Sequence, residues 1–252
     1  MVKRVCVIGA GPSGITAAKN LLDEGHEVVV YDQGREVGGN WVFDEATGHS
    51  SVFETTHIIS SKQFSQYDDY PMPDSYPDYP SHLQLAEYFQ AYARTFNLYP
   101  SIRFNTKVLH CEPLTGEKWK VKTESAGELK EEIFDALAVC NGHHWLPRMP
   151  EYPGVFNGTL IHSHAVKKFS VFRDKRVLVI GGGNSACDVA VESSRVAKSV
   201  DISWRRGYWI APKFMMGKPA DVFSSRLNWL PQALWQRLSA ISLYIRNGSN
   251  KQ

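Results

Sequence analysis

Residues 5–14 read Val-Cys-Val-Ile-Gly-Ala-Gly-Pro-Ser-Gly, and residues 27–32 read Glu-Val-Val-Val-Tyr-Asp after an intervening helix-like run. The apolar residues 5–8 are typical of a parallel strand that is buried on both faces. Gly9, Gly11 and Gly14 follow this strand in G-x-G-x-x-G spacing. Such glycines permit a tight turn, a close backbone approach to a pyrophosphate and close packing of a helix on the sheet. The stretch therefore predicts a dinucleotide-binding turn.

The residues around this turn support the same prediction. Pro12 and Ser13 open the helix, where proline loses no hydrogen bond and the free N–H groups attract phosphate. Asp32 ends the second strand 23 residues after Gly9, a position from which an acid accepts hydrogen bonds from a ribose hydroxyl. The alternative is an ordinary strand–turn–helix whose glycines serve packing only. The complete strand–turn–helix–strand–acid order favours the nucleotide.

Composition narrows the class of protein. The chain has 252 residues, 43% of them hydrophobic, and a net charge of +2 without a block of basic residues. No nucleic-acid partner is expected from this charge. Four scattered cysteines without a C-x-x-C pair favour a reducing compartment, and we expect a cytoplasmic protein.

The pair His143-His144 lacks accompanying carboxylates or cysteines, so we expect no metal site. No segment reaches the length of a membrane-spanning helix.

The middle of the chain predicts one helix and a small β insert. Ser81 and Gln84 form a capping box, and a helical apolar stripe follows from Leu85 to Phe96. Strands are expected at about 103–110, 118–123 and 132–140, as a small antiparallel insert whose last part returns to the main sheet. Residues 64–80 are rich in Tyr, Asp and Pro, and both a rigid surface loop and a wall over the cofactor remain open.

The opening pattern returns 172 residues later. Val177–Ile180 predicts a second buried strand, and Gly181-Gly182-Gly183-Asn184-Ser185-Ala186 follows it. We expect its helix to run to about Ala197 and a further strand over 200–204. Ala186 replaces the third glycine, so this helix should lie slightly further from its sheet. Arg205 and Arg206 stand where the first copy has an acid, and arginine suits a ribose 2′-phosphate. The first site thus favours an unphosphorylated ribose and the second favours NADPH.

Further motifs give the chain a family resemblance. Phe156-x-Gly158-x-x-x-His162 lies just upstream of the second glycine turn, Gly38-Gly39-Asn40-Trp41 follows the first, and Cys140-Asn141-Gly142-His143-His144 precedes the linker. In these motifs the chain resembles the flavin-containing monooxygenases. In this family the motif that begins at Phe156 ends with an aromatic residue four positions after the histidine, and this position is Val166 here. Many members also carry an asparagine near the flavin, and the corresponding residue here is Ile59, followed by Ser60.

The resemblance implies FAD at the first turn and NADPH at the second. It implies that NADPH reduces the flavin, that O2 adds at the flavin C4a, and that a small amine or thioether takes up one oxygen atom. The flavin does the bond-making, so no protein catalytic residue is assigned beyond Ser60 near the flavin. The cofactor residues are expected to be Gly9, Gly11, Pro12, Ser13, Gly14, Asp32, Gly39, Asn40 and Trp41 for FAD and Gly181, Gly183, Asn184, Ser185, Ala186, Arg205 and Arg206 for NADPH.

The expected fold is α/β, with two Rossmann-like domains and the β insert. We assign residues 1–147 to the FAD-binding domain and 148–252 to an incomplete NADPH-binding domain that ends in a helical segment carrying Leu234, Leu238, Ile241 and Ile245. Family members are normally considerably longer. A truncated, non-catalytic nucleotide-binding chain therefore remains an alternative. A pyridine-nucleotide flavoprotein reductase is another, although the missing C-x-x-C pair and the Phe156–His162 motif argue against it. An oligomer and membrane association through a segment beyond this chain also remain open.

Overall fold

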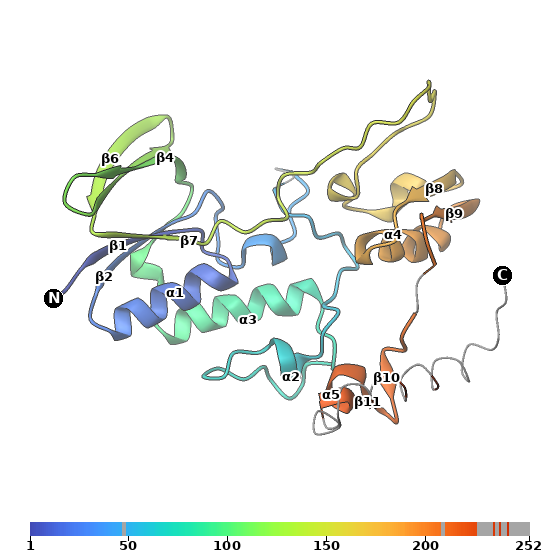
Figure 1. Ribbon diagram of the computed structural model, residues 1–252, viewed down its shortest axis with the longest axis horizontal. Coiled ribbons are helices and arrows are strands. Elements are labelled where there is room, and N and C mark those ends of the chain that lie inside the picture. Colours follow the sequence, from blue (N-terminus) through green and yellow to red (C-terminus); the bar gives the residue numbers. More distant parts are fainter. Residues whose placement is uncertain (47–48, 208–209, 226–233, 235–236, 238–240, 242–252) are drawn as a thin grey trace. The chain divides into compact units, whose positions relative to one another are not determined.

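The computed structural model describes residues 1–46, 49–207 and 210–225, together with Leu234, Arg237 and Ile241 (Figure 1). These residues form two compact units. The first contains Met1–Thr56 and Ser81–Lys168, and the second contains His57–Pro80 and the chain from Phe169 onward. In the predicted C-terminal stripe, Leu238 and Ile245 lie outside the described residues.

A parallel sheet organises the first unit. It contains β1 (Arg4–Ile8), β2 (Glu27–Tyr31), β3 (Ile102–Arg103) and β7 (Ala136–Val139) in the order β3-β2-β1-β7. Every neighbouring pair is parallel, and Ile8 lies opposite both Tyr31 and Val139. The carboxyl ends of these strands therefore meet at one edge, where ligands of open α/β sheets bind.

Two helices cover one face of this sheet, as Figure 1 shows: α1 (Pro12–Asp23) and α3 (His82–Thr95). The predicted capping box is present, because Ser81 accepts a hydrogen bond from the Gln84 N–H and the Gln84 side chain bonds back to the Ser81 N–H. The predicted apolar stripe is also confirmed, since Leu85, Tyr88, Phe89, Tyr92 and Ala93 are buried. The 3₁₀ helices η1 (Gly39–Trp41) and η2 (Tyr99–Ser101) complete this side of the unit.

An antiparallel insert covers the other face. It contains β4 (Lys107–Leu114), β5 (Lys118–Ser125) and β6 (Glu128–Phe134) in the order β4-β5-β6. Val121 and Phe134 of the insert pack with Cys6, Val29 and Tyr31 of the parallel sheet in one buried cluster. Burial raises the pKa of the Cys6 thiol to about 12, so this cysteine behaves as a small apolar residue.

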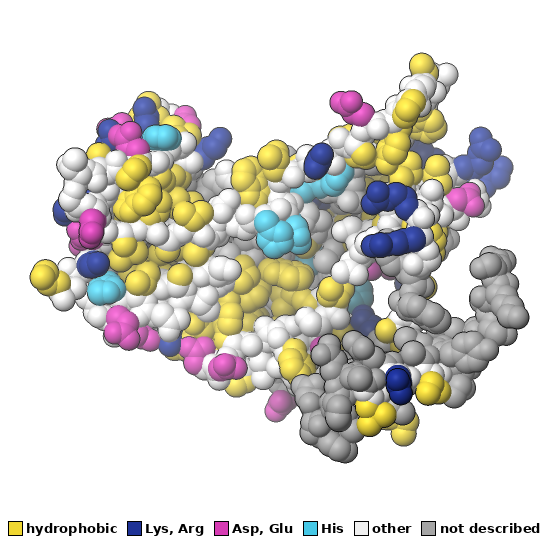
Figure 2. All heavy atoms as spheres, viewed as in Figure 1, with side chains coloured by type: hydrophobic (Ala, Val, Ile, Leu, Met, Phe, Trp, Pro, Cys, Tyr) yellow, Lys and Arg dark blue, Asp and Glu magenta, His cyan; other side chains and the backbone are white. Residues whose placement is uncertain are grey.

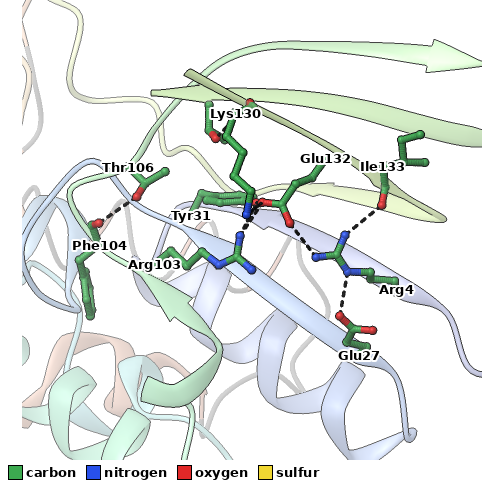
Figure 3. Close-up of polar contacts among 10 residues, drawn as sticks. Arg4, Glu27, Tyr31, Arg103, Phe104, Thr106, Lys130, Glu132 and Ile133 are labelled. Atoms are coloured by element: carbon green, nitrogen blue, oxygen red, sulfur yellow. Dashed lines mark hydrogen bonds and ion pairs between the residues drawn. The ribbon is translucent and has the colours of Figure 1, made fainter. Parts of the chain in front are cut away.

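A buried carboxylate fastens the insert to the sheet (Figure 3). Glu132 of β6 accepts hydrogen bonds from the Tyr31 hydroxyl (2.5 Å), Arg4 Nη2 (2.9 Å) and Arg103 Nη1 (2.5 Å), and it lies 3.2 Å from Lys130 Nζ. Burial raises the pKa of Glu132, but the hydrogen bonds and positive charges outweigh this effect and lower it to about 2. The contact ties β1, β2 and β3 to β6.

Two predicted strands are each divided in the structure. Residues 103–110 contain the end of β3 and the start of β4, separated at Asn105, whose φ of 51° breaks the extended chain. Residues 132–140 contain the end of β6 and all of β7, separated at Asp135. The Asp135 N–H donates to the Arg4 carbonyl, and its carboxylate accepts from the Arg4 N–H, each at 2.8 Å. These contacts redirect the chain from the insert into the parallel sheet.

The second unit repeats the β–α–β pattern. Its strands β8 (Arg176–Ile180) and β9 (Ser199–Ser203) pair in parallel, and α4 (Asn184–Ser194) connects them. The helix ends three residues before the predicted Ala197, and β9 begins and ends one residue before the predicted strand. The unit also contains the helices α2 (Lys62–Ser65), η4 (Phe169–Phe172) and α5 (Ala220–Ser225), and the hairpin of β10 (Phe214–Met215) with β11 (Lys218–Pro219).

The linker after β7 exposes a run of apolar side chains. Figure 2 shows hydrophobic atoms along the protruding part of this linker, and Leu146, Val155 and Phe156 are largely exposed. Val166 stands where the family motif that begins at Phe156 has an aromatic residue. It is buried just after η3 (Ser163–Ala165). Across the described part of the chain, none of the helices is both long and apolar enough to cross a membrane.

Candidate dinucleotide-binding sites

The first glycine turn joins β1 to α1 at the carboxyl edge of the parallel sheet. Gly9 has a φ of 103°, and its N–H donates to the Tyr31 carbonyl at 2.8 Å. A Cβ atom at Gly9 would lie 2.5 Å from the Cys140 carbonyl oxygen, and one at Gly14 would lie 1.7 Å from the Gly9 carbonyl oxygen. These two positions require glycine for packing within the protein itself.

Gly11 differs from its two neighbours because the protein leaves room beside it. It is the N-cap of α1, and a Cβ there would meet only Gly39 Cα at an ordinary 3.5 Å and Gly39 N at 3.9 Å. Pro12 occupies the first helical turn, Ser13 is exposed, and the first turn contains no acidic residue. The Gly14 and Ile15 N–H groups donate to the Gly11 carbonyl at 3.0 and 3.1 Å, so the positive end of the helix dipole and the exposed Ser13 are what suit an anion here. Packing within the protein therefore does not require a glycine at residue 11.

The structure places Gly39 beside this turn, and Asn40 and Trp41 follow it in η1. Gly39 has a φ of 55°, and a Cβ there would lie 2.9 Å from Gly11 Cα. The Gly38 N–H donates to the Ala10 carbonyl at 3.2 Å, and the Trp41 N–H donates to the Gly38 carbonyl at 3.1 Å. The two glycine-bearing segments thus pack backbone against backbone.

Asp32 also joins the turn, through contacts that the sequence did not reveal. One carboxylate oxygen accepts from the Ala10 N–H and the other from the Gly34 N–H, both at 2.6 Å. A Cβ at Gly34 would lie 2.9 Å from Asp32 Oδ1, so glycine permits this approach. Each carboxylate oxygen retains further acceptor capacity. Asp32 can therefore hold the turn and still accept a ribose hydroxyl.

Sequence reasoning missed the residues that contact Asn40. The Ser51 N–H and hydroxyl both donate to Asn40 Oδ1 at 2.8 Å, and the Ser50 hydroxyl donates to the Asn40 carbonyl at 2.5 Å. Lys167 Nζ in turn donates to the Ser50 carbonyl. Burial lowers the pKa of Lys167, which the charge of Asp44 partly offsets. No local sequence pattern predicts the contact between Ser50 and Lys167, because the two residues are 117 positions apart in the chain.

The second glycine turn reproduces the first within its own unit. The Gly181 N–H donates to the Ser203 carbonyl at 2.9 Å, and the Cys187 N–H donates to the Gly183 carbonyl at 3.1 Å. Gly183 is the N-cap of α4, and a Cβ there would have no neighbour within 4 Å. Asn184 and Ser185 are exposed at the helix start. Packing within the protein therefore does not require a glycine at this position either.

The two turns differ at the third glycine position and at the end of the second strand. Ala186 carries a methyl group where Gly14 has no room for one, and a Cβ at Gly181 would lie 3.6 Å from it. Arg205 and Arg206 follow β9 and are both exposed. Two cations therefore stand near the end of the second strand in the second unit, where the first unit has Asp32.

Ser60 belongs to the second unit and not to the unit that carries the first turn. Its hydroxyl shares a 2.7 Å hydrogen bond with the Ser65 hydroxyl. The adjoining Lys62 Nζ donates to the carbonyls of Pro73, Asp74 and Tyr76 at 3.3, 3.1 and 2.8 Å. These bonds fold residues 62–76 into a compact loop, and a role for Ser60 near the flavin stays a prediction.

A family model described as "Flavin-binding monooxygenase-like" matches residues 2–247, nearly the whole chain. The chain belongs to this family.

Relatives of this flavin-binding monooxygenase-like chain are similar over the same region. Human flavin-containing monooxygenase 5 is 41% identical over 237 residues, which are 89% of this chain and 44% of the human protein. The dimethylaniline monooxygenase [N-oxide-forming] 2 of Macaca mulatta is 40% identical over 238 residues, or 90% and 44% of the two chains. The chain thus spans about half the length of these relatives.

Solved structures of flavin monooxygenases share the fold. The S-allyl-L-cysteine S-oxygenase of Allium sativum superposes with a TM-score of 0.78 at 29% identity, covering 86% of this chain and 54% of that one. A flavin-containing monooxygenase from Stenotrophomonas maltophilia gives a TM-score of 0.74 at 26% identity, covering 95% and 68%. Their likeness supports the α/β fold with its parallel sheet and small antiparallel sheet.

Proposed function

We propose that this chain binds FAD at the first glycine turn and NADPH at the second, as part of a monooxygenase that transfers oxygen from O2 to a small amine or thioether. The opposite charges at the two strand ends carry this proposal, because Asp32 suits a free ribose and Arg205 a 2′-phosphate. The substrate class is drawn from the family and from the names of its members.

The residues present fit both cofactors. Gly11 and Gly183 are glycines at positions where the protein itself has space for a side chain, as expected where a pyrophosphate approaches the backbone. When bound, FAD and NADPH supply hydride transfer and oxygen activation. The chain's own residues bind and orient them: the α1 and α4 N-termini hold phosphate, Asp32 holds ribose, and Arg205 and Arg206 hold the 2′-phosphate.

The decisive experiment uses the two turns as controls for each other. Gly11→Ala adds a methyl group that the protein tolerates but that occupies the place of the pyrophosphate. It should weaken FAD binding about a hundredfold, which corresponds to about 2.7 kcal/mol, in a titration followed by flavin fluorescence. Gly183→Ala should leave FAD binding unchanged and weaken NADPH binding instead. Equal FAD affinity in the wild type and in Gly11→Ala would contradict the assignment.

A nucleotide-binding chain without turnover is the second candidate. NADPH oxidation with a thioether and FAD distinguishes the two, since a monooxygenase forms sulfoxide in step with NADPH consumption. A flavoprotein reductase would consume NADPH without sulfoxide. The four free cysteines support a reducing, cytoplasmic location.

A further inference from the structure

Asn40 carries a side chain whose orientation is fixed by its neighbours. The Ser51 backbone N–H can only donate, so the Asn40 atom that faces it at 2.8 Å must be the carbonyl oxygen Oδ1. The Ser51 hydroxyl bonds to the same oxygen at 2.8 Å. The amide nitrogen Nδ2 therefore remains as the donor of this side chain, and no residue in the described part of the chain is bonded to it.

Asn40 follows the glycine that packs against the first glycine turn. Its neighbour Gly39 packs against Gly11, where a Gly39 Cβ would lie 2.9 Å from Gly11 Cα. The backbone of Asn40 is held as well, because its carbonyl accepts from the Ser50 hydroxyl at 2.5 Å. Ser50 is almost fully buried. Asn40 is thus fixed through both its backbone and its side chain, and its neighbour Gly39 contacts the turn.

The linker between the two glycine turns supports these serines. Lys167 Nζ donates to the Ser50 carbonyl, and the Lys167 carbonyl accepts from the Glu54 N–H at 3.0 Å. The next residue, Lys168, forms an exposed ion pair with Glu45, in which the nitrogen and oxygen lie 2.7 Å apart. The two adjacent lysines therefore differ, because Lys167 contacts the buried Ser50 whereas Lys168 lies at the surface.

We propose that Ser51, supported by Ser50 and Lys167, is a positioning residue that turns the Asn40 amide so that Nδ2 donates to the dinucleotide at the first glycine turn. This inference rests on the proposed binding of FAD there. It assigns to the linker a part in shaping the first site, through contacts from Lys167 to Ser50 and from Ser50 to Asn40.

The test measures FAD affinity in Ser51→Ala, Ser51→Thr, Asn40→Asp and Lys167→Met variants of this chain. Loss of a well-formed hydrogen bond predicts that Ser51→Ala weakens FAD binding about tenfold, while Ser51→Thr retains the hydroxyl and restores affinity. Asn40→Asp keeps an acceptor for Ser51 but removes the donor, so it should weaken binding at least as much. Lys167→Met should weaken binding several-fold.

Two controls separate positioning from general destabilisation. Lys168→Met removes the neighbouring surface charge. Ser125→Ala removes a serine hydroxyl that donates to the Asn105 carbonyl at 3.1 Å in the insert. Both should keep FAD affinity within about twofold of the wild type. Wild-type affinity in Ser51→Ala, or equal losses in Lys167→Met and Lys168→Met, would overturn the inference.

Hydrogen exchange of the ligand-free chain provides a readout that does not depend on FAD. The Trp41 and Val42 amides bond to the carbonyls of Gly38 and Gly39, and they should exchange faster in Ser51→Ala than in Ser125→Ala. Unchanged exchange would contradict positioning by Ser51. A wild-type chain that fails to bind FAD would instead contradict the proposed function and the ligand contact of Asn40, while exchange still decides the positioning.

Discussion

The two glycine turns share one backbone design and differ in what surrounds it. Gly9 and Gly181 lie 172 residues apart, and their N–H groups donate to the second strand at 2.8 and 2.9 Å. Cys6 and Leu178 occupy equivalent strand positions, yet Cys6 is 0% exposed and Leu178 is 61% exposed. The insert covers Cys6, whereas no described residue covers Leu178 in the second unit. The turn is thus independent of how the sheet behind it is covered.

The largest expected effect concerns the third glycine position. Gly14→Ala would place a methyl group 1.7 Å from the Gly9 carbonyl oxygen, so backbone must move. We expect the free energy of unfolding to fall by about 3 kcal/mol or more, measured by urea denaturation. Ala186→Gly in the second turn should cost only about 0.5–1 kcal/mol, through helix propensity. A Gly14→Ala variant of wild-type stability would mean that the two turns do not differ in this way.

The insert provides the next test, because only the first unit has it. Glu132 has a pKa near 2, below the ordinary 4.5, so its contribution is fully present above pH 4.5 and is lost as the pH falls toward 2. Glu132→Gln should lower the free energy of unfolding by about 3 kcal/mol at pH 7. Below pH 4.5 the free energy of unfolding of this variant should fall less steeply with decreasing pH than that of the wild type.

Glu131 is the matched control for this change. Its side chain is 52% exposed and lies 3.9 Å from Lys120, so Glu131→Gln should change stability by less than about 0.5 kcal/mol. Equal effects of the two substitutions in urea titrations at pH 7 would show that Glu132 does not hold the insert to the sheet.

The charge difference at the strand ends predicts a smaller and more specific effect. Arg205→Ala should weaken NADPH binding by about 1.5–3 kcal/mol, the range for a charge-assisted contact, and leave NADH binding unchanged. Arg195→Ala removes an exposed arginine paired with Glu192 at 3.3 Å in the same unit and should change neither affinity. An unaltered preference for NADPH in Arg205→Ala would transfer the role to Arg206.

The smallest expected effect tests the uncovered face. Leu178→Thr should change the free energy of unfolding by less than about 0.5 kcal/mol, because the side chain is 61% exposed. Cys6→Ser, at the equivalent covered position, should cost about 1–3 kcal/mol by burying an unpaired hydroxyl. Similar losses in both variants would indicate that Leu178 is covered in solution.

The sequence could predict the features that are determined by residues close together in the chain. The G-x-G-x-x-G spacing predicts the first turn, and its repetition with Ala186 as the last residue predicts the second turn and the second β–α–β unit. The Ser81–Gln84 capping box predicts the start of α3. The same spacing assigns close helix packing to Gly14 and the approach of a pyrophosphate to Gly11. The short distance from a Gly14 Cβ to Gly9 agrees with the first expectation, whereas the room beside Gly11 could be found only from its distances to Gly39.

What sequence could not predict depends on contacts between distant residues. The strand boundary at Asp135 follows from its pairing with Arg4, 131 residues away. The grouping of residues 57–80 with the second unit includes the bond from the Ser61 N–H to Asp221 at 2.7 Å. The support of Asn40 by Ser50 and Lys167 spans 117 residues. None of these pairs leaves a periodic or spaced pattern in the chain.

The central claim is that the chain holds two separate sites of opposite ribose preference. The most direct test is an equilibrium titration of the wild-type chain with FAD, in the absence and in the presence of saturating 2′,5′-ADP, a probe of the 2′-phosphate site. The two-site account predicts one FAD per chain with an unchanged dissociation constant in both titrations. Displacement of FAD by 2′,5′-ADP would show a single shared site and contradict it.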